Sequence, residues 1–218
     1  MNKSEVLNAI REIGVVPVIR INDLDNARNA VEAMILGGIK IFEVTMTVPN
    51  AISLIDELSK REGLVVGAGT VLDPETAGEC IDAGAAFVVS PSTNIDTVAY
   101  CNERQTAVMP GALTPTEIVN AWEAGADIVK VFPAGSLGGP KYIRSLKGPL
   151  PHIKMMPTGG VSIDSVADYL LSGAEAVGVG SELVDVRAVE EGRLIELTGA
   201  AKEYIEAVEK ARVRLKAG

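Results

Sequence analysis

Residues 127–133 read Asp-Ile-Val-Lys-Val-Phe-Pro, a short apolar run with one lysine, Lys130, at its centre. A continuous β-branched run of this length is typical of a strand that is buried on both faces of a parallel sheet. An ammonium group in such a strand costs on the order of several kcal/mol unless it is paired or loses its proton. The neutral amine is a nucleophile toward carbonyl carbon, so Lys130 indicates Schiff-base chemistry.

Similar apolar runs recur along the whole chain, and amphipathic segments separate them. The eight predicted strands are residues 15–20, 40–46, 64–71, 87–90, 107–110, 128–132, 154–157 and 176–179. The segments between them carry helix signals. Asp73-Pro74 and Thr114-Pro115 place a capping residue before a proline, and Gly84 and others follow predicted helix ends. The repeating unit is therefore strand, loop, helix, glycine.

Eight such units in 218 residues predict an α/β fold, a TIM (β/α)8 barrel that forms one domain over residues 1–218. Residues 3–13 are predicted to be an extra N-terminal helix that closes the bottom of the barrel. Residues 189–215 are predicted to be the last helix or pair of helices. The competing fold is an open doubly wound sheet, but the count of eight strands and the placement of polar residues favour the barrel.

Composition limits the classes of partner. The formal net charge of −9 argues against nucleic acid as the main partner. No apolar stretch approaches the ~20 residues of a membrane span, and the N-terminus has no signal-peptide core, so we expect a cytoplasmic protein with no membrane partner. Cys80 and Cys101 suit a reducing compartment and are expected to be small buried hydrophobes rather than a disulfide.

Histidine occurs once, as His152 in a proline-flanked segment. A catalytic zinc site usually needs two or three imidazoles, and a Ser-His-Asp triad needs a histidine held by a carboxylate. We therefore expect no metal site and no cofactor, and we expect His152 to be a solvated loop residue.

Strand alternation predicts which side chains face the inside of the barrel. In the second strand Glu43 and Thr45 share one face and Phe42 and Val44 the other. Because the outer face packs on helices, the charged face must point inward, and the same argument places Lys130 inside. Lys130 and Glu43 could be a structural ion pair, but such pairs stabilise weakly. With Arg20 also at a strand end, a functional site in which Glu43 moves protons is the better interpretation.

The last two strands end in glycine-rich loops, Thr158-Gly159-Gly160 and Gly180-Ser181. In barrels of this type these two loops often bind phosphate through backbone N–H groups and a helix N-terminus. The alternative is that the glycines only make tight turns. Two adjacent loops of this composition favour a phosphate site.

Motifs at the predicted strand ends carry a resemblance. They read Val-Pro-Val-Ile-Arg at 16–20, Glu-Val-Thr at 43–45, Gly-Ala-Gly-Thr-Val at 67–71, Ser-Pro at 90–91, Pro-Gly at 110–111, Lys-Val-Phe-Pro-Ala at 130–134, Pro-Thr-Gly-Gly-Val at 157–161 and Gly-Val-Gly-Ser at 178–181. From near its start to about residue 185 the chain resembles the family of 2-keto-3-deoxy-6-phosphogluconate aldolase and 4-hydroxy-2-oxoglutarate aldolase.

The resemblance implies a class I, metal-independent carbon–carbon lyase that is a homotrimer and acts on a 2-oxo acid. It implies Lys130 as the Schiff-base lysine and Glu43 as the general acid/base. The implied substrate contacts are Arg20, Thr47, Thr70, Pro91 and Phe132, and the implied phosphate contacts are Thr158, Gly159, Gly160, Gly180 and Ser181. The implied reaction gives pyruvate and glyceraldehyde 3-phosphate.

One position departs from the family. Thr47 stands where many members have an arginine for the pyruvate carboxylate. Substrate identity is therefore open among the phosphogluconate compound, its galactonate epimer and 4-hydroxy-2-oxoglutarate, which would give glyoxylate and pyruvate. Two other classes remain as alternatives, namely a phosphosugar isomerase or epimerase and a non-catalytic phosphometabolite-binding barrel.

Overall fold

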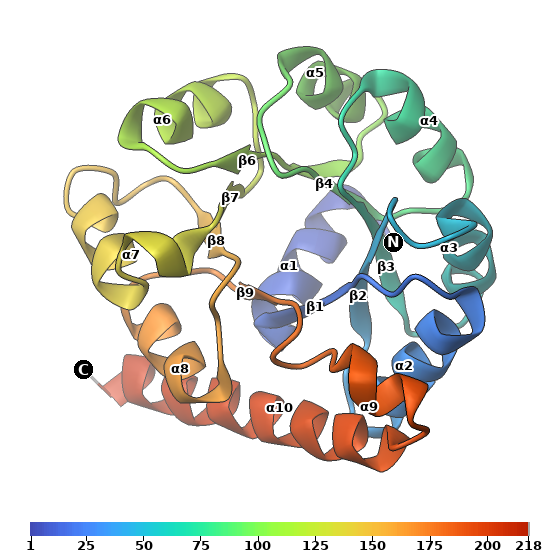
Figure 1. Cartoon of the computed structure of the whole chain (residues 1–218). Coiled ribbons are helices and arrows are strands. Elements are labelled where there is room, and N and C mark those ends of the chain that lie inside the picture. Colours follow the sequence, from blue (N-terminus) through green and yellow to red (C-terminus); the bar gives the residue numbers. More distant parts are fainter. Residues whose placement is uncertain (218) are drawn as a thin grey trace.

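The structure is a computed structural model that describes residues 1–217. Parallel strands form a ring and helices surround it (Figure 1). The strands are β1 (Val15–Ile19), β2 (Ile41–Thr45), β3 (Val65–Gly69), β4 (Phe87–Val89), β5 (Ala107–Met109), β6 (Gly111–Ala112), β7 (Val129–Val131), β8 (Met155–Pro157) and β9 (Val177–Val179). The helices of the ring are α2 (Leu24–Leu36), α3 (Ala51–Ser59), α4 (Pro74–Asp82), α5 (Ile95–Glu103), α6 (Pro115–Glu123), α7 (Pro140–Lys147) and α8 (Ile163–Leu171).

The ring is assembled from two sheets. Hydrogen bonds join the strands in the order β5-β4-β3-β2-β1-β9 and, in the second sheet, β6-β7-β8. The sheets meet at one seam where Thr158 bridges Gly178 beyond the end of β8. They meet at the other because β5 and β6 follow each other along the chain. The prediction of a (β/α)8 barrel is confirmed.

The fifth predicted strand differs from the observed one. It was expected at residues 107–110, but the structure divides it at Pro110 into β5 and the short β6. Proline has no N–H to donate to a sheet. Its carbonyl still accepts a hydrogen bond from the Lys130 amide at 2.9 Å. The barrel strand therefore continues two residues beyond the predicted end.

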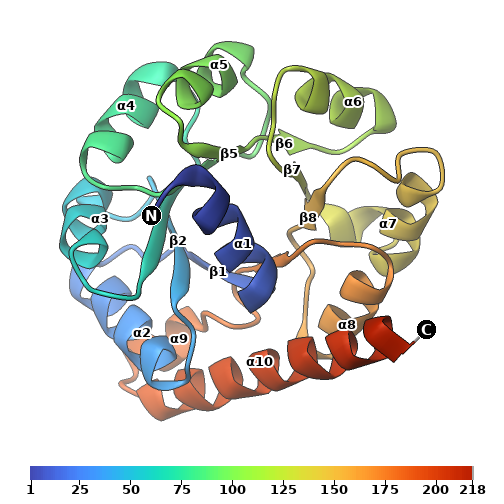
Figure 2. The ribbon, with the colours of Figure 1, turned by 180° about the vertical axis from the view of Figure 1, so that it is seen from behind.

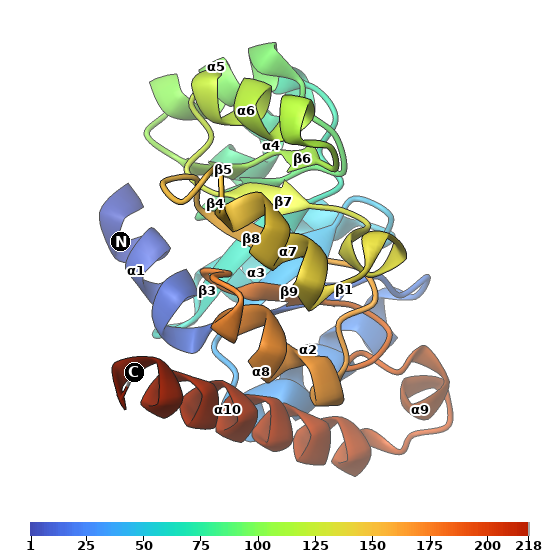
Figure 3. The same cartoon turned by 90° about the vertical axis from the view of Figure 1, so that its left-hand side faces the viewer.

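The N-terminal helix α1 spans Lys3–Ile13, as predicted. It lies across the end of the barrel where the strands begin (Figures 2 and 3). Val6 and Ile10 are buried, and Gly14, with φ of 74°, turns the chain directly into β1. Lys3 binds Asp127 at 2.9 Å. The helix thus closes this end of the barrel.

Local capping explains where the surrounding helices begin and end. Asp73 and Thr114 accept hydrogen bonds from the first turns of α4 and α6, as predicted. Glycines with φ between 97° and 102° follow the ends of α2, α4, α6 and α8, and these are Gly38, Gly84, Gly125 and Gly173. Each reverses the chain toward the next strand.

The C-terminal part forms a short helix, α9 (Val186–Glu190), and a long one, α10 (Leu194–Ala217). Of the single helix or pair expected over residues 189–215, the structure has one long helix there, and α9 begins three residues before that range. The long helix α10 packs along α8 and α2 on the outside of the ring (Figure 1). The hydroxyl of Thr198 donates to the carbonyl of Ala33 at 2.8 Å and fixes α10 to α2. Within the part of the chain that the structure describes, no helix has the length and apolar character needed to cross a membrane.

Candidate active site

Lys130 and Glu43 meet in the interior of the barrel. Their strands, β7 and β2, are not neighbours in the ring, yet Lys130 Nζ lies 3.5 Å from Glu43 Oε1. The side chains are 4% and 0% exposed. Phe42 and Val44, on the opposite face of β2, are buried under the helices. The predicted inward direction of Lys130 and Glu43 is confirmed.

The neighbouring strand makes room for the carboxylate. Gly69 pairs in register with Thr45 on β2, so both face inward. A Cβ atom at Gly69 would lie 2.2 Å from Glu43 Oε1. Glycine at this position therefore lets Glu43 extend toward Lys130.

Glu43 has one oxygen free. Among the described residues, Oε2 has no hydrogen-bond partner although it is buried. A buried polar atom without a partner costs about 1–3 kcal/mol, so such atoms in native proteins call for an explanation. Here the free oxygen can take or give a proton beside the amine of Lys130.

A cavity of about 240 Å³ opens above Lys130. It gathers residues from β1 and β7, from the segments that follow β1, β7, β8 and β9, and from the start of α9. The lining residues are Val18, Arg20, Lys130, Phe132, Thr158, Gly159, Gly160, Val161, Gly180, Ser181, Glu182, Val184 and Val186. Most of the residues expected from the sequence are therefore brought together. Sequence reasoning missed Val18, which alternation places on the inward face with Arg20, and Glu182, which directly follows Ser181.

Hydrogen bonds fix the orientation of the peptide groups in the loop after β8. The carbonyls of Thr158 and Gly159 accept from the amides of Ala134 and Gly135, both at 2.9 Å. In a trans peptide the N–H points opposite to the C=O. The amides of Gly159 and Gly160 therefore point away from Ala134 and Gly135. The Gly159 amide faces Gly178 across the bridge between β8 and β9, and the Gly160 amide has no hydrogen-bond acceptor among residues 1–217.

These two glycines are required by the backbone. Gly159 and Gly160 have φ of 83° and 74°, values that side-chain-bearing residues rarely adopt. A Cβ at Gly160 would lie 3.1 Å from the Cα of Gly135. The unpaired amide of the exposed Gly160, next to the start of α8, suits an anion.

Arg20 supplies the guanidinium of the cavity. It is exposed and forms no ion pair with any residue that the structure describes. Thr158 adds a buried hydroxyl, whose Oγ1 has no partner in the described part of the chain. Both groups are therefore free to bind a ligand. Within residues 1–217, no group of three or more His, Cys, Asp or Glu side chains is arranged to hold a metal ion.

Three predicted contact residues lie outside this lining. Thr47 is exposed at the end of β2, and Thr70 follows β3 with φ of 60°, an uncommon conformation for threonine. Such strain often marks functional sites. Pro91 instead lines a second cavity of about 390 Å³ together with Thr93, Ile95 and others. The single histidine, His152, is exposed as predicted and packs edge-on against Trp122.

Comparison with known proteins gives consistent matches. The family model described as KDPG and KHG aldolase matches residues 6–199. The KHG/KDPG aldolase of Escherichia coli K12 is 34% identical over 194 residues, which are 88% of this chain and 91% of that relative.

Two solved structures are also similar. KDPG aldolase from Legionella pneumophila, with pyruvate captured at low pH as a covalent carbinolamine, has a TM-score of 0.83 at 29% identity and covers 90% of this chain and 96% of its own. The aldolase of Zymomonas mobilis ZM4 with 3-phosphoglycerate has a TM-score of 0.80 at 29% identity and covers 93% and 95%. On its matched length, its barrel and these relatives, the chain belongs to the KDPG and KHG aldolase family.

Proposed function

We propose that this protein is a class I, metal-independent aldolase that cleaves 2-keto-3-deoxy-6-phosphogluconate to pyruvate and glyceraldehyde 3-phosphate. The observation that carries the proposal is the buried contact between Lys130 and Glu43, at 3.5 Å, beside a cavity whose lining includes the unpaired amide of Gly160. An amine held in an apolar interior is suited to attack a carbonyl carbon. The carbinolamine of the Legionella relative supports the same reaction here.

The first steps form the Schiff base. The neutral amine of Lys130 attacks the 2-oxo carbon and gives a carbinolamine, and loss of water gives the iminium ion. Glu43 is near enough to protonate the departing hydroxyl, because its Oε1 lies 3.5 Å from Nζ. The positive iminium then draws electrons from the neighbouring carbon–carbon bond.

The carbon–carbon bond is cleaved because the iminium ion accepts its electron pair. Glu43, as carboxylate, takes the proton of the C4 hydroxyl directly or through water, the C3–C4 bond breaks, and glyceraldehyde 3-phosphate leaves. Glu43 then returns the proton that it took to C3 of the pyruvate enamine, which restores the iminium ion. Water adds to this iminium carbon, Glu43 takes the proton of the new hydroxyl, and the carbon–nitrogen bond breaks to release pyruvate and the amine of Lys130.

We assign the substrate phosphate to the loops after β8 and β9. The amides of Gly160 and Gly180 would donate to its oxygens beside Gly159, with Ser181 and Thr158 adding hydroxyls. The 3-phosphoglycerate in the Zymomonas relative supports a phosphorylated ligand. At the other end we assign the carboxylate to Arg20 and Thr70, with Phe132 beside the reacting carbons. Pro91 lines a different cavity, which leaves its proposed contact without geometric support.

The substrate assignment is tested by comparing kcat/KM for three compounds. These are the phosphogluconate substrate, its phosphogalactonate epimer and 4-hydroxy-2-oxoglutarate. We expect the phosphogluconate substrate to be cleaved at least about tenfold more efficiently than 4-hydroxy-2-oxoglutarate, because charge-assisted hydrogen bonds contribute about 1.5–3 kcal/mol each. Equal or better cleavage of 4-hydroxy-2-oxoglutarate contradicts the assignment of a phosphate site. Better cleavage of the phosphogalactonate epimer contradicts the choice of the phosphogluconate compound as the substrate.

We also propose a homotrimer in the cytoplasm. Family likeness supports the trimer, and the free, buried Cys80 and Cys101 suit a reducing compartment. Sedimentation equilibrium should give three times the chain mass of 22.8 kDa. A mass of one or two chains contradicts the trimer.

A further inference from the structure

Two threonine hydroxyls connect the ends of β1 and β2 at the rim of the barrel. Thr45 Oγ1 donates to the carbonyl of Ile19 at 2.9 Å, and it lies 2.7 Å from Thr47 Oγ1. Thr45 is fully buried on the face it shares with Glu43, and Thr47 is exposed. Ile19 directly precedes Arg20, which lines the cavity.

The direction of this chain of hydroxyls follows from donor counting. A carbonyl oxygen only accepts, and a hydroxyl carries one hydrogen. The hydrogen of Thr45 is therefore used at Ile19, and the hydrogen between the two hydroxyls comes from Thr47. No other arrangement satisfies both contacts. Thr47 is left with lone pairs and no free hydrogen.

This direction determines which ligand groups Thr47 can bind. A carboxylate is an acceptor only, so it gains nothing from a hydroxyl whose hydrogen is already engaged. A substrate hydroxyl, in contrast, can donate to the exposed oxygen of Thr47. We propose that Thr47 accepts a hydrogen bond from a hydroxyl of the substrate chain, so that this position selects a hydroxylated 2-oxo acid and leaves the carboxylate to Arg20 and Thr70.

The inference rests on the proposed aldolase function and names the part of the substrate that this rim contacts. Pyruvate has a carboxylate and no hydroxyl, whereas 2-keto-3-deoxy-6-phosphogluconate has both. Two measurements on the full-length protein therefore separate the two groups. One is the pyruvate concentration that gives half-maximal labelling in the presence of borohydride, and the other is kcat/KM for cleavage of the phosphogluconate substrate.

The variants are Thr47→Val, which removes the hydroxyl at nearly constant shape, and Thr47→Ser, which keeps it. Thr116→Val, at an exposed position on α6, is the matched control. Thr47→Val should lower kcat/KM about 3- to 10-fold, the effect of one hydrogen bond, and leave the half-maximal pyruvate concentration unchanged. Thr47→Ser should retain most of the kcat/KM that Thr47→Val loses, and Thr116→Val should behave like the wild type in both assays.

Two results overturn the inference while the aldolase function stands. Unchanged kcat/KM in Thr47→Val shows that Thr47 does not contact the substrate. A rise in the half-maximal pyruvate concentration that matches the fall in kcat/KM shows that Thr47 binds the carboxylate. Absence of any pyruvate label on the wild type overturns the proposed function itself. Because Thr47 is exposed, circular dichroism should show all three variants folded.

Discussion

At the scale of single residues, the pair formed by Lys130 and Glu43 is the central feature. Both groups are removed from water, and replacing a buried ion pair by apolar residues is often neutral or stabilising. Stability therefore gives little reason for these charges to be inside the barrel. Their position beside a cavity, with Glu43 Oε2 unpartnered among the described residues, agrees with the proton transfer that we propose.

Replacing Glu43 separates binding from turnover. In Glu43→Gln the side chain keeps its shape and loses its proton-transfer function. We expect kcat for cleavage to fall by about 10²–10⁴, the usual contribution of general acid/base catalysis, while pyruvate is still trapped on Lys130 at equilibrium. Steady-state cleavage and end-point borohydride labelling measure the two quantities. Normal turnover would show that Glu43 does not move the proton.

The small residue beside Glu43 provides a second test at this scale. An added methyl group in Gly69→Ala would meet Glu43 Oε1 at 2.2 Å and displace the carboxylate. We expect kcat to fall by at least about tenfold, since a small misplacement of a catalytic group can cost as much as a hundredfold. Gly199→Ala, in α10 with no atom within 4 Å of the new Cβ, is the control and should leave kcat unchanged. Full activity of Gly69→Ala would show that the position of Glu43 tolerates displacement.

At the scale of elements, strand periodicity predicted which side chains face the inside of the barrel but not how far apart they lie. Alternation along β2 and β7 correctly placed Glu43 and Lys130 inside, because only one face of each strand can meet the helices. It could not give their separation, because β2 and β7 are brought together by closure of the whole ring. The strand continues past Pro110 as β6 because β6 pairs with β7, and this pairing could not be predicted from the sequence either.

The motifs at the strand ends identified candidate site residues but not which residues contact them in the folded protein. They identified Gly159 and Gly160, but the hydrogen bonds that aim their amides come from Ala134 and Gly135 in a different loop. They also grouped Pro91 with the substrate contacts, although it lines a separate cavity. Contacts between loops depend on tertiary packing, which a single sequence does not display.

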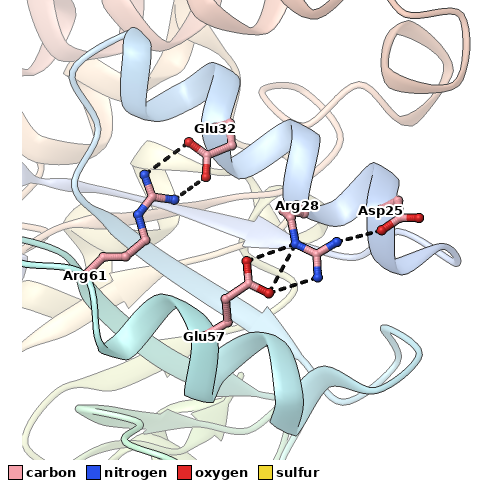
Figure 4. Close-up of polar contacts among 5 residues, drawn as sticks. All are labelled: Asp25, Arg28, Glu32, Glu57 and Arg61. Carbon is pink, nitrogen blue, oxygen red and sulfur yellow. Dashed lines mark hydrogen bonds and ion pairs between the residues drawn. The ribbon is translucent and has the colours of Figure 1, made fainter.

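Ion pairs join two helices on the outside of the barrel. Arg28 on α2 binds Glu57 on α3 at 2.9 Å and Asp25 at 2.6 Å, and a second pair joins Glu32 to Arg61 (Figure 4). The hydrogen bond from Arg28 lowers the pKa of Glu57. A lowered carboxyl pKa stabilises the fold above the pKa of the unfolded chain, about 4.3, and this contribution is lost as pH falls through the folded value.

Arg28→Gln therefore tests the contribution of this network. Because the pairs are exposed, we expect the Tm near pH 7 to fall by no more than about 2–4 °C. The difference from wild type should shrink in about 1 M salt and at a pH below the folded pKa of Glu57. Lys60→Gln, which breaks a pair within α3 alone, is the matched control. A difference in Tm that persists unchanged in acid contradicts the electrostatic explanation.

At the scale of the whole molecule, both thiols are buried on α4 and α5, two neighbouring helices that cover the outside of the barrel. Cys80 and Cys101 are fully buried, and burial raises the pKa of Cys80 to about 12 and that of Cys101 to about 11. The thiolate is the reactive form. We expect a disulfide reagent near pH 8 to react with neither thiol in the folded protein. In denaturant it should react with both, which are all the cysteines of the chain. Rapid reaction of either thiol in the native protein would show local opening of α4 or α5.

Among the described residues that line the cavity, Lys130 is the one lysine. The most direct test incubates the protein with pyruvate and borohydride and maps the modified peptide by mass spectrometry. We expect a stable pyruvate adduct on Lys130 in the wild type and no adduct in Lys130→Met. A wild-type protein that stays unlabelled, or an adduct on another lysine, would contradict the assignment of Lys130 as the Schiff-base residue.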